Sequence, residues 1–169
     1  LQTVDARGVI EDDVEPLSID THRRYCELTA MLDRLHRRYL DVVRMELEEI
    51  GVRDVNPSQA LLLTMLNEGD VPLRDIMQRG GYTSSTATYM IKKLVDHGYL
   101  EQARAPHDRR TMRLRLTRSG ARIADHLRQL NSRHADFVGS EDGLSAKIAD
   151  TTTTLRHIDR VWTEFLTFG

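Results

Sequence analysis

The stretch that decides the fold is residues 83–120, TSSTATYMIKKLVDHGYLEQARAPHDRRTMRLRLTRSG. Its first part places a capping residue, Thr83, before a run that ends at Gly98, with apolar residues at helical spacing between them. Its second part holds two segments of strand character, YLEQAR and TMRLRLT, on either side of the turn-rich APHDRR. The order predicts a capped helix followed by a β-hairpin.

The helix has an apolar stripe on one face and small, polar and basic side chains on the other. The residues expected to point outward are Ser84, Ser85, Thr86, Thr88, Tyr89 and Lys92. In the second strand Met112, Leu114 and Leu116 alternate with Arg113 and Arg115. This alternation is typical of a half-buried hairpin with a basic outer face.

The residues before this stretch complete a helix-turn-helix. A brief helix is predicted over 73–78, and it runs into a Gly-Gly turn at 80–81. Further upstream, NPSQALLLTMLNEG places Asn56 and Gln59 at the spacing of a capping box, which predicts a short and mostly buried helix. A helix, a helix-turn-helix and a basic hairpin in this order describe a winged helix, so the expected fold class is mainly α (α+β) with a small β-hairpin wing.

Long helices flank this unit. Residues 21–50 carry two apolar rows at helical spacing, and a further helix starts after Thr117. The last helix has a seam with alternating spacings of four and three, formed by Leu144, Ile148, Thr151, Leu155, Ile158, Trp162 and Phe165. Such a seam is typical of helices shared between two chains, and packing on the first long helix is the alternative.

These patterns predict four regions. We expect an acidic N-terminal arm at 1–20, a dimerisation helix at 21–55, a winged helix-turn-helix DNA-binding domain at 56–117 and C-terminal dimerisation helices at 118–169.

Charge is segregated along the chain. The 169 residues include 24 Lys and Arg against 26 Asp and Glu, a net charge of −2 with a pI near 6.4. Residues 74–122 hold eleven Lys and Arg against four acids, which is +7, so the remainder carries −9. A compact basic region favours a phosphate-bearing partner, and a solvated charged face is the alternative.

The sequence gives little support for a membrane protein, a secreted protein, an enzyme or a metalloprotein. There is no apolar run near the 18 or so residues of a membrane span, and the acidic first residues do not resemble a signal peptide, so we expect a cytoplasmic protein. The chain lacks a Gly-rich phosphate loop, a GxSxG motif and a marked carboxylate pair, so no enzyme is expected. The seven His lack metal-ligand spacing, so no metal and no cofactor are expected.

Residues 83–120 resemble the multiple antibiotic resistance regulator (MarR) family. The positions that match the family at the correct mutual spacing are Thr83, Gly98, Asp108, Arg109, Arg110, Leu116, Thr117 and Gly120. The resemblance implies a homodimeric DNA-binding repressor or activator that binds a pseudo-palindromic operator, with recognition helices in successive major grooves and wings in the adjacent minor grooves. It extends from about Thr21 onward.

The resemblance also assigns roles in the wing. It implies that Asp108 pairs with the Arg that probes the minor groove, and the sequence leaves open whether that is Arg109 or Arg110. Arg113 is expected to contact DNA from the same wing. Many family members carry Arg where Ser84 and Tyr89 stand, so DNA shape and the wing are expected to carry more of the specificity here.

The remaining candidates are regulatory. In the family, small molecules bound between the dimer helices and the winged domain uncouple DNA binding. The residues expected to line such a pocket are Leu35, Tyr39, Val43, Met65 and Leu66, which core packing explains equally well. Cys26 is either a buried inert thiol or a redox sensor activated by Arg23 and Arg24. The alternative function is a winged-helix dimer that serves as a protein interaction module without DNA binding.

Overall fold

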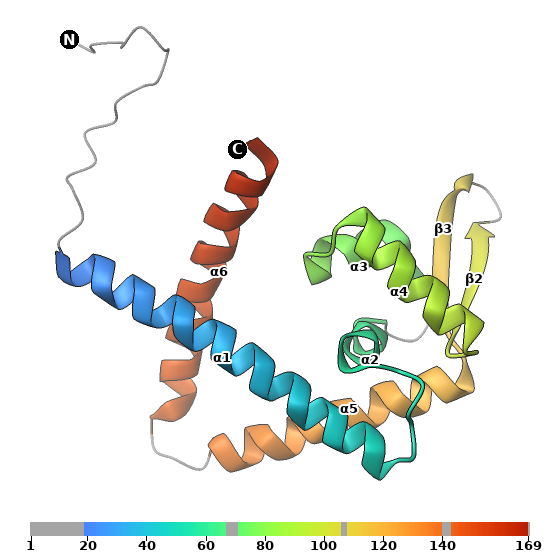
Figure 1. Cartoon of the computed structure of the whole chain (residues 1–169), viewed down its shortest axis with the longest axis horizontal. Helices are drawn as coiled ribbons and strands as arrows, with labels where there is room; N and C mark the ends of the chain where they lie inside the picture. The colour runs from blue at the N-terminus through green and yellow to red at the C-terminus, as the bar shows by residue number, and fades with distance from the viewer. Residues whose placement is uncertain (1–18, 67–70, 106–107, 140–142, 169) are drawn as a thin grey trace, which may run out of the picture. The chain divides into compact units, whose positions relative to one another are not determined.

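The computed structural model describes residues 19–66, 71–105, 108–139 and 143–168, and Figure 1 gives their elements in chain order. The chain divides into two units, one ending at Gly51 and the other running from Val52 to Gly169. The predicted acidic arm lies outside the described residues, apart from its last two positions.

The first unit contains α1 (Ile19–Glu49), which confirms the long helix predicted over 21–50. Ion pairs at i,i+3 and i,i+4 spacing line its surface, such as Arg37 with Asp33 and Arg44 with Asp41, both at 2.7 Å. Its buried residues, Val43 and Leu47, lie in its second half. The helix therefore carries its deeply buried apolar side chains only near its C-terminal end.

The second unit begins with α2 (Pro57–Thr64), where the predicted capping box is confirmed. The Asn56 side chain accepts a hydrogen bond from the Gln59 backbone N–H at 2.9 Å, and the Gln59 side chain accepts from the Asn56 N–H at 3.0 Å. The backbone N–H and the side-chain oxygen of the buried Gln59 therefore both have hydrogen-bond partners at the helix start. At the other end of α2, the Arg128 guanidinium donates to the Leu66 carbonyl at 2.7 Å.

The helix-turn-helix consists of α3 (Leu73–Gly80) and α4 (Ser84–Asp96), as predicted. The chain leaves α3 through Gly81, whose φ of 61° is the left-handed conformation that glycine adopts without strain. Ile76 and Leu94 are fully buried, so both helices contribute to the core of the second unit.

A three-stranded antiparallel sheet completes the winged helix, with strand order β1-β3-β2. The strands are β1 (Val71–Pro72), β2 (Leu100–Ala105) and β3 (Asp108–Leu116). The sequence pattern did not predict β1, which pairs Val71 with Leu114. It also assigned Asp108 to the turn, whereas the backbone pairs Asp108 with Ala105, because the ladder continues to within two residues of the tip.

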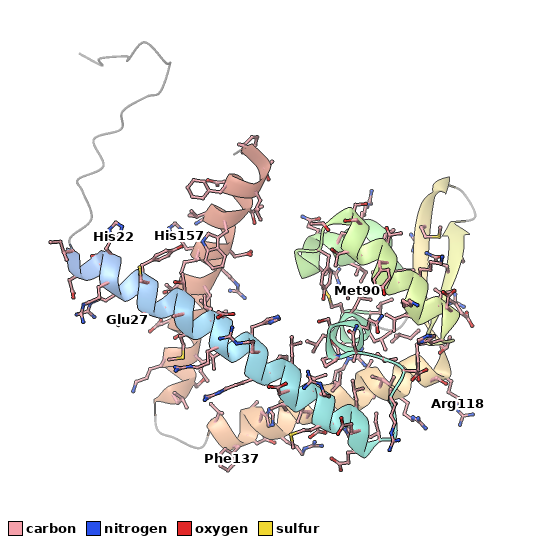
Figure 2. The ribbon with its side chains drawn as sticks, viewed as in Figure 1. His22, Glu27, Met90, Arg118, Phe137 and His157 are labelled. Carbon is pink, nitrogen blue, oxygen red and sulfur yellow. The ribbon has the colours of Figure 1, made fainter. Side chains whose placement is uncertain are left out.

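Two further helices follow the sheet, α5 (Arg118–Val138) and α6 (Leu144–Phe168). The α5 residues Ile123, Leu127 and Leu130 are buried, and α5 packs against α2. Phe137, near the end of the same helix, is 85% exposed and projects from α5 (Figure 2). No residue of α6 is buried within the described chain.

The four consecutive threonines at 151–154 lie on α6. Each hydroxyl donates to the carbonyl four residues earlier, at 2.8–3.1 Å, so the run supplies no unsatisfied donor. Among the helices that the structure describes, none is long and apolar enough to cross a membrane.

Candidate nucleic-acid interface

The second helix of the helix-turn-helix, α4, packs against the rest of its unit through one face. Ala87, Met90, Ile91 and Leu94 are buried, and Figure 2 shows Met90 on the inner side of the helix. All six residues predicted on the opposite face are exposed: Ser84, Ser85, Thr86, Thr88, Tyr89 and Lys92. The structure thus confirms which face of α4 is available, and a DNA contact by these residues remains a prediction.

The start of α4 is fixed by a small hydroxyl cluster. Thr83 is the N-cap, and its Oγ1 accepts a hydrogen bond from the Thr86 backbone N–H at 3.3 Å. The same hydroxyl donates to Thr86 Oγ1 at 2.9 Å and lies 3.2 Å from Ser85 Oγ. The hydroxyls of Ser85 and Thr86 therefore take part in the cap.

Two contacts hold the turn before α4. The Tyr82 backbone N–H donates to the Met77 carbonyl at 3.1 Å, which ties the turn to α3. The Tyr82 ring lies so close to Gly80 that a Cβ there would collide with it. Burial raises the pKa of Tyr82 above its usual value, in keeping with this packed position.

Three residues of the family-like motif form the joint at the base of the wing. The Thr117 hydroxyl donates to the Gly98 carbonyl at 2.7 Å and accepts from the Gly120 N–H at 3.1 Å. The Thr117 N–H donates to the Tyr99 carbonyl at 3.1 Å, and a Cβ on Gly120 would collide with that same oxygen. The spacing of Gly98, Thr117 and Gly120 thus reflects a direct connection between the end of α4 and the start of α5.

A second contact at this joint was missed by sequence reasoning. The Tyr99 hydroxyl donates to Asp54 Oδ1 at 2.8 Å, and His97 Nδ1 lies 3.7 Å from Asp54 Oδ2. Partial burial raises the pKa of Tyr99, the bond to Asp54 raises it further, and the nearby Arg122 acts in the opposite direction. No local pattern signals this contact, because its partners are 45 residues apart.

The wing is described mainly through its backbone. Asp108, Arg109 and Arg110 lie in β3, and their side chains are outside the described part of the structure. Arg115 is exposed, as predicted, whereas Arg113 is only half-exposed. Arg113 is more covered because β3 is the central strand and pairs this residue with both Pro72 and Ala103.

The predicted pocket residues differ in exposure. Val43 and Leu66 are fully buried, Tyr39 and Met65 are half-buried, and Leu35 is 51% exposed. The structure has an open hollow of about 670 Å³ elsewhere, lined by Arg118, Ser119, Ala121, Arg122, Asp125, His126 and Gln129 of α5.

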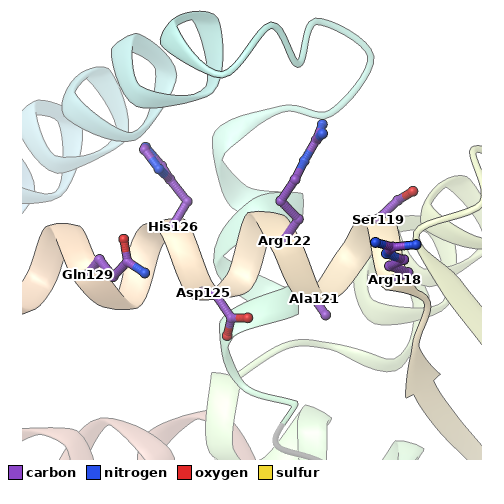
Figure 3. A pocket seen from close by; sticks show the side chains of 7 residues that line it. All are labelled: Arg118, Ser119, Ala121, Arg122, Asp125, His126 and Gln129. Atoms are coloured by element: carbon purple, nitrogen blue, oxygen red, sulfur yellow. The ribbon is translucent and has the colours of Figure 1, made fainter.

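The lining side chains of this hollow do not converge. Figure 3 shows Arg122 and His126 on one side of α5, and Ala121 and Asp125 on the opposite side. The hollow therefore lacks the inward-directed polar groups of a ligand site. Within the described residues, no group of three or more His, Cys, Asp and Glu is placed to hold a metal ion.

Of the two interpretations of Cys26, the buried thiol is wrong for this chain, because the residue is exposed on α1. Arg23 and Arg24 both pair with Asp20, at 2.8 and 2.6 Å, and Arg23 lies 3.6 Å from Glu27. The two guanidinium groups hold the pKa of Asp20 below its usual value. Carboxylates thus offset the cationic setting that was expected to activate Cys26.

Comparison with known proteins agrees with this architecture. Residues 55–120 match the family model of the winged helix DNA-binding domain. The exopolysaccharide II synthesis transcriptional activator ExpG of Rhizobium meliloti is 28% identical over 145 residues, which cover 86% of this chain and 75% of that protein.

Two solved structures share the fold. A MarR transcriptional regulator from Methanosarcina mazei Go1 has a TM-score of 0.63 at 20% identity, covering 80% of this chain and 97% of that one. FabT of Streptococcus pneumoniae, solved in complex with DNA, has a TM-score of 0.62 at 21% identity, covering 83% of this chain and 99% of that one.

The fold and the family match identify residues 55–120 as a winged helix DNA-binding domain. The chain is similar to a transcriptional activator and shares the fold of MarR transcriptional regulators.

Proposed function

We propose that the chain acts as a homodimer that binds a pseudo-palindromic operator with two copies of α4 and two wings. The observation that carries this proposal is the composition of the exposed α4 face, where hydroxyl groups from Ser84 to Thr88 precede Lys92 and Lys93. Short side chains at the start of a helix let its backbone approach a duplex, and longer cations further along reach phosphates.

The central strand of the sheet, β3, adds positively charged residues to those of α4. β3 contains four Arg, at positions 109, 110, 113 and 115, and Arg118 follows at the start of α5. We assign the wing residues Asp108, Arg109, Arg110 and Arg113 to DNA contact, with one Arg entering the minor groove. A narrow A·T-rich minor groove has the enhanced negative potential that attracts such a side chain.

The exposed apolar side chains of α6 support the dimer. Ile148 and Trp162 of the seam are 46% and 40% exposed, and Phe165 is 71% exposed. Soluble monomers rarely leave a contiguous apolar row of this length in water. A second copy of the chain provides the matching seam, since a twofold interface pairs like with like.

Regulation completes the proposal. We place an effector pocket beside Leu35, Tyr39, Val43, Met65 and Leu66, so that a small molecule or stress signal modulates DNA affinity. A Cys26-based response and an interaction module without DNA binding are the competing proposals, and the exposure of Cys26 favours the former of these two. Because its target is chromosomal DNA, we place the protein in the cytoplasm.

The test is selection of bound duplexes from a random 30-bp library by the purified protein, followed by anisotropy titration over a salt series. We expect enrichment of a sequence with two half-sites about 10 bp apart. Retention of all duplexes alike, or of none, contradicts sequence-specific binding and favours the interaction module.

A further inference from the structure

The exposed face of α4 lacks the Arg side chain that most often contacts DNA bases. The 13 residues of α4, SSTATYMIKKLVD, contain no Arg, and the two Lys lie in the last half. The bidentate contact that Arg makes with guanine is therefore absent from the first two turns. The exposed side chains of these two turns therefore offer hydroxyl groups, the methyl groups of two threonines and one aromatic ring for base contacts.

The hydrogen bonds of the Thr83 cap reduce the number of side-chain hydroxyl groups on α4 that are available to a partner. Ser85 and Thr86 are already engaged by the Thr83 hydroxyl, at 3.2 and 2.9 Å. Within the described part of the chain, the side chains of Ser84, Thr88 and Tyr89 make no hydrogen bond. Three side chains thus remain available at the front of the helix.

Thr88 and Tyr89 also carry the apolar surface of this face. Tyr89 is 61% exposed, and the core of the unit does not require its ring, because Ala87, Met90 and Ile91 supply the buried stripe of α4. Thr88 is exposed beside it and offers a Cγ2 methyl group. The exposed face of α4 thus presents apolar atoms from both residues, a methyl group and a ring, beside its hydroxyl groups.

We propose that Thr88 and Tyr89 read the 5-methyl group of a pyrimidine in the major groove, which in an unmodified operator is the methyl group of thymine. This inference rests on the proposed function, since it requires α4 to enter the groove. Thymine presents an acceptor and a methyl group there, and apolar side chains pack on that methyl group. A single hydroxyl distinguishes bases poorly, so the methyl contact carries the discrimination at this position.

The experiment uses the full-length protein and the duplex recovered by library selection. Each dT of a half-site is replaced in turn by dU, which removes only the methyl group. We expect one position per half-site to lower affinity about fourfold, as expected for one buried methyl-sized group. Replacement of dT by dU in the central spacer is the control, with no change expected.

Two further arms separate the methyl group from the rest of the base. At the sensitive position, a C·G pair weakens binding, and 5-methylcytosine in its place recovers about fourfold relative to cytosine. If cytosine and 5-methylcytosine bind equally, the discrimination depends on hydrogen bonds and the inference is overturned.

Matched double variants test the two residues. Thr88→Ser with Tyr89→Ala removes the methyl group and the ring, and we expect the dT-to-dU ratio to fall to about one. Thr88→Val with Tyr89→Phe replaces the Thr88 hydroxyl with a methyl group and removes the Tyr89 hydroxyl, and we expect the ratio to persist. The opposite pattern assigns the reading to the hydroxyls and overturns the inference.

Failure of this inference is distinguishable from failure of the proposed function. If the library yields no enriched duplex, sequence-specific DNA binding itself is wrong. If it yields an operator that the parent protein binds equally well with dT or dU at every position, DNA binding stands and methyl reading is wrong.

Discussion

The Tyr99 hydroxyl donates a 2.8 Å hydrogen bond to Asp54, which joins the turn after the recognition helix to the segment before α2. His97, two residues earlier, faces the other carboxylate oxygen at 3.7 Å. One carboxylate therefore contacts both ends of the turn that leads from α4 into β2. This contact complements the Thr117 joint, which holds the same turn from the side of α5.

We expect Asp54→Ala to destabilise the protein by about 1 kcal/mol, because a charged acceptor is lost from a contact that is partly screened by solvent. Asp54→Asn retains an acceptor for Tyr99 and should have the smaller effect. Urea unfolding of both variants measures the difference. Equal loss in the two variants would show that the carboxylate charge, rather than the Tyr99 hydrogen bond, stabilises the turn.

Stability should fall in alkaline solution, beginning near the usual tyrosine pKa of about 10. The pKa values of Tyr82 and Tyr99 are raised in the folded chain, so the folded state binds their protons more tightly than the unfolded state. Their contribution is complete below pH 10 and is lost as the pH rises through the folded values. Thermal unfolding from pH 8 to 11 checks this, and Tyr82→Phe should flatten the profile.

Two glycines should differ in their tolerance of alanine. Gly81→Ala places a Cβ in open space at a φ of 61°, so we expect a cost of about 1 kcal/mol from backbone strain alone. Gly120→Ala brings its Cβ into the Tyr99 carbonyl oxygen, and we expect about 3 kcal/mol from this steric conflict. Equilibrium unfolding should rank the variants in this order, and the reverse order would refute the steric account.

Placing charges in the α6 seam should break the proposed dimer. We expect Leu155→Asp with Ile158→Asp to sediment as a monomer or as unfolded chain, because two carboxylates cannot be buried there without partners. Thr153→Asp with Arg160→Asp changes the side of α6 away from the seam and serves as the control. An unchanged dimer in the seam variant would place the interface elsewhere.

Neutralising single cations should separate phosphate contacts from groove reading. We expect Lys92→Ala, Lys93→Ala and Arg115→Ala each to weaken all duplexes alike and to reduce the salt slope by about 0.9. Arg109→Ala with Arg110→Ala should cost most on operators with A·T-rich flanks. Asp108→Ala should cause a smaller loss of the same kind. Anisotropy titrations on matched duplexes measure this, and equal binding to all duplexes would argue against a wing probe.

The sequence predicted the elements whose signals are local. The Asn56–Gln59 capping box, the Thr83 cap and the stripe of α4 each depend on spacings of a few residues, and the structure confirms all three. The sequence did not predict β1, because a two-residue strand has no periodicity and is defined only by its pairing with β3. Phe137 follows the helical period of the buried residues Ile123, Leu127 and Leu130 but is 85% exposed, so periodicity alone does not determine burial.

The candidate interface was predictable in outline. Helical periodicity fixes which residues of α4 face outward, and all six predicted residues are exposed. Periodicity does not show that Ser85 and Thr86 are occupied by the cap, or that Arg113 is partly covered, because these properties depend on rotamers and on strand neighbours. The contact of Asp54 with Tyr99 is a tertiary event between distant segments, and no local pattern encodes it.

The joint formed by Gly98, Thr117 and Gly120 positions α4 without contributing to the surface that is expected to contact DNA. The Thr117 hydroxyl bonds the Gly98 carbonyl and the Gly120 N–H, and none of these three residues belongs to the exposed face of α4. Two regulators that share this signature are therefore alike in how the reading helix is mounted. They remain free to recognise unrelated genes, because a few substitutions on the outer face redirect the protein while its frame stays intact.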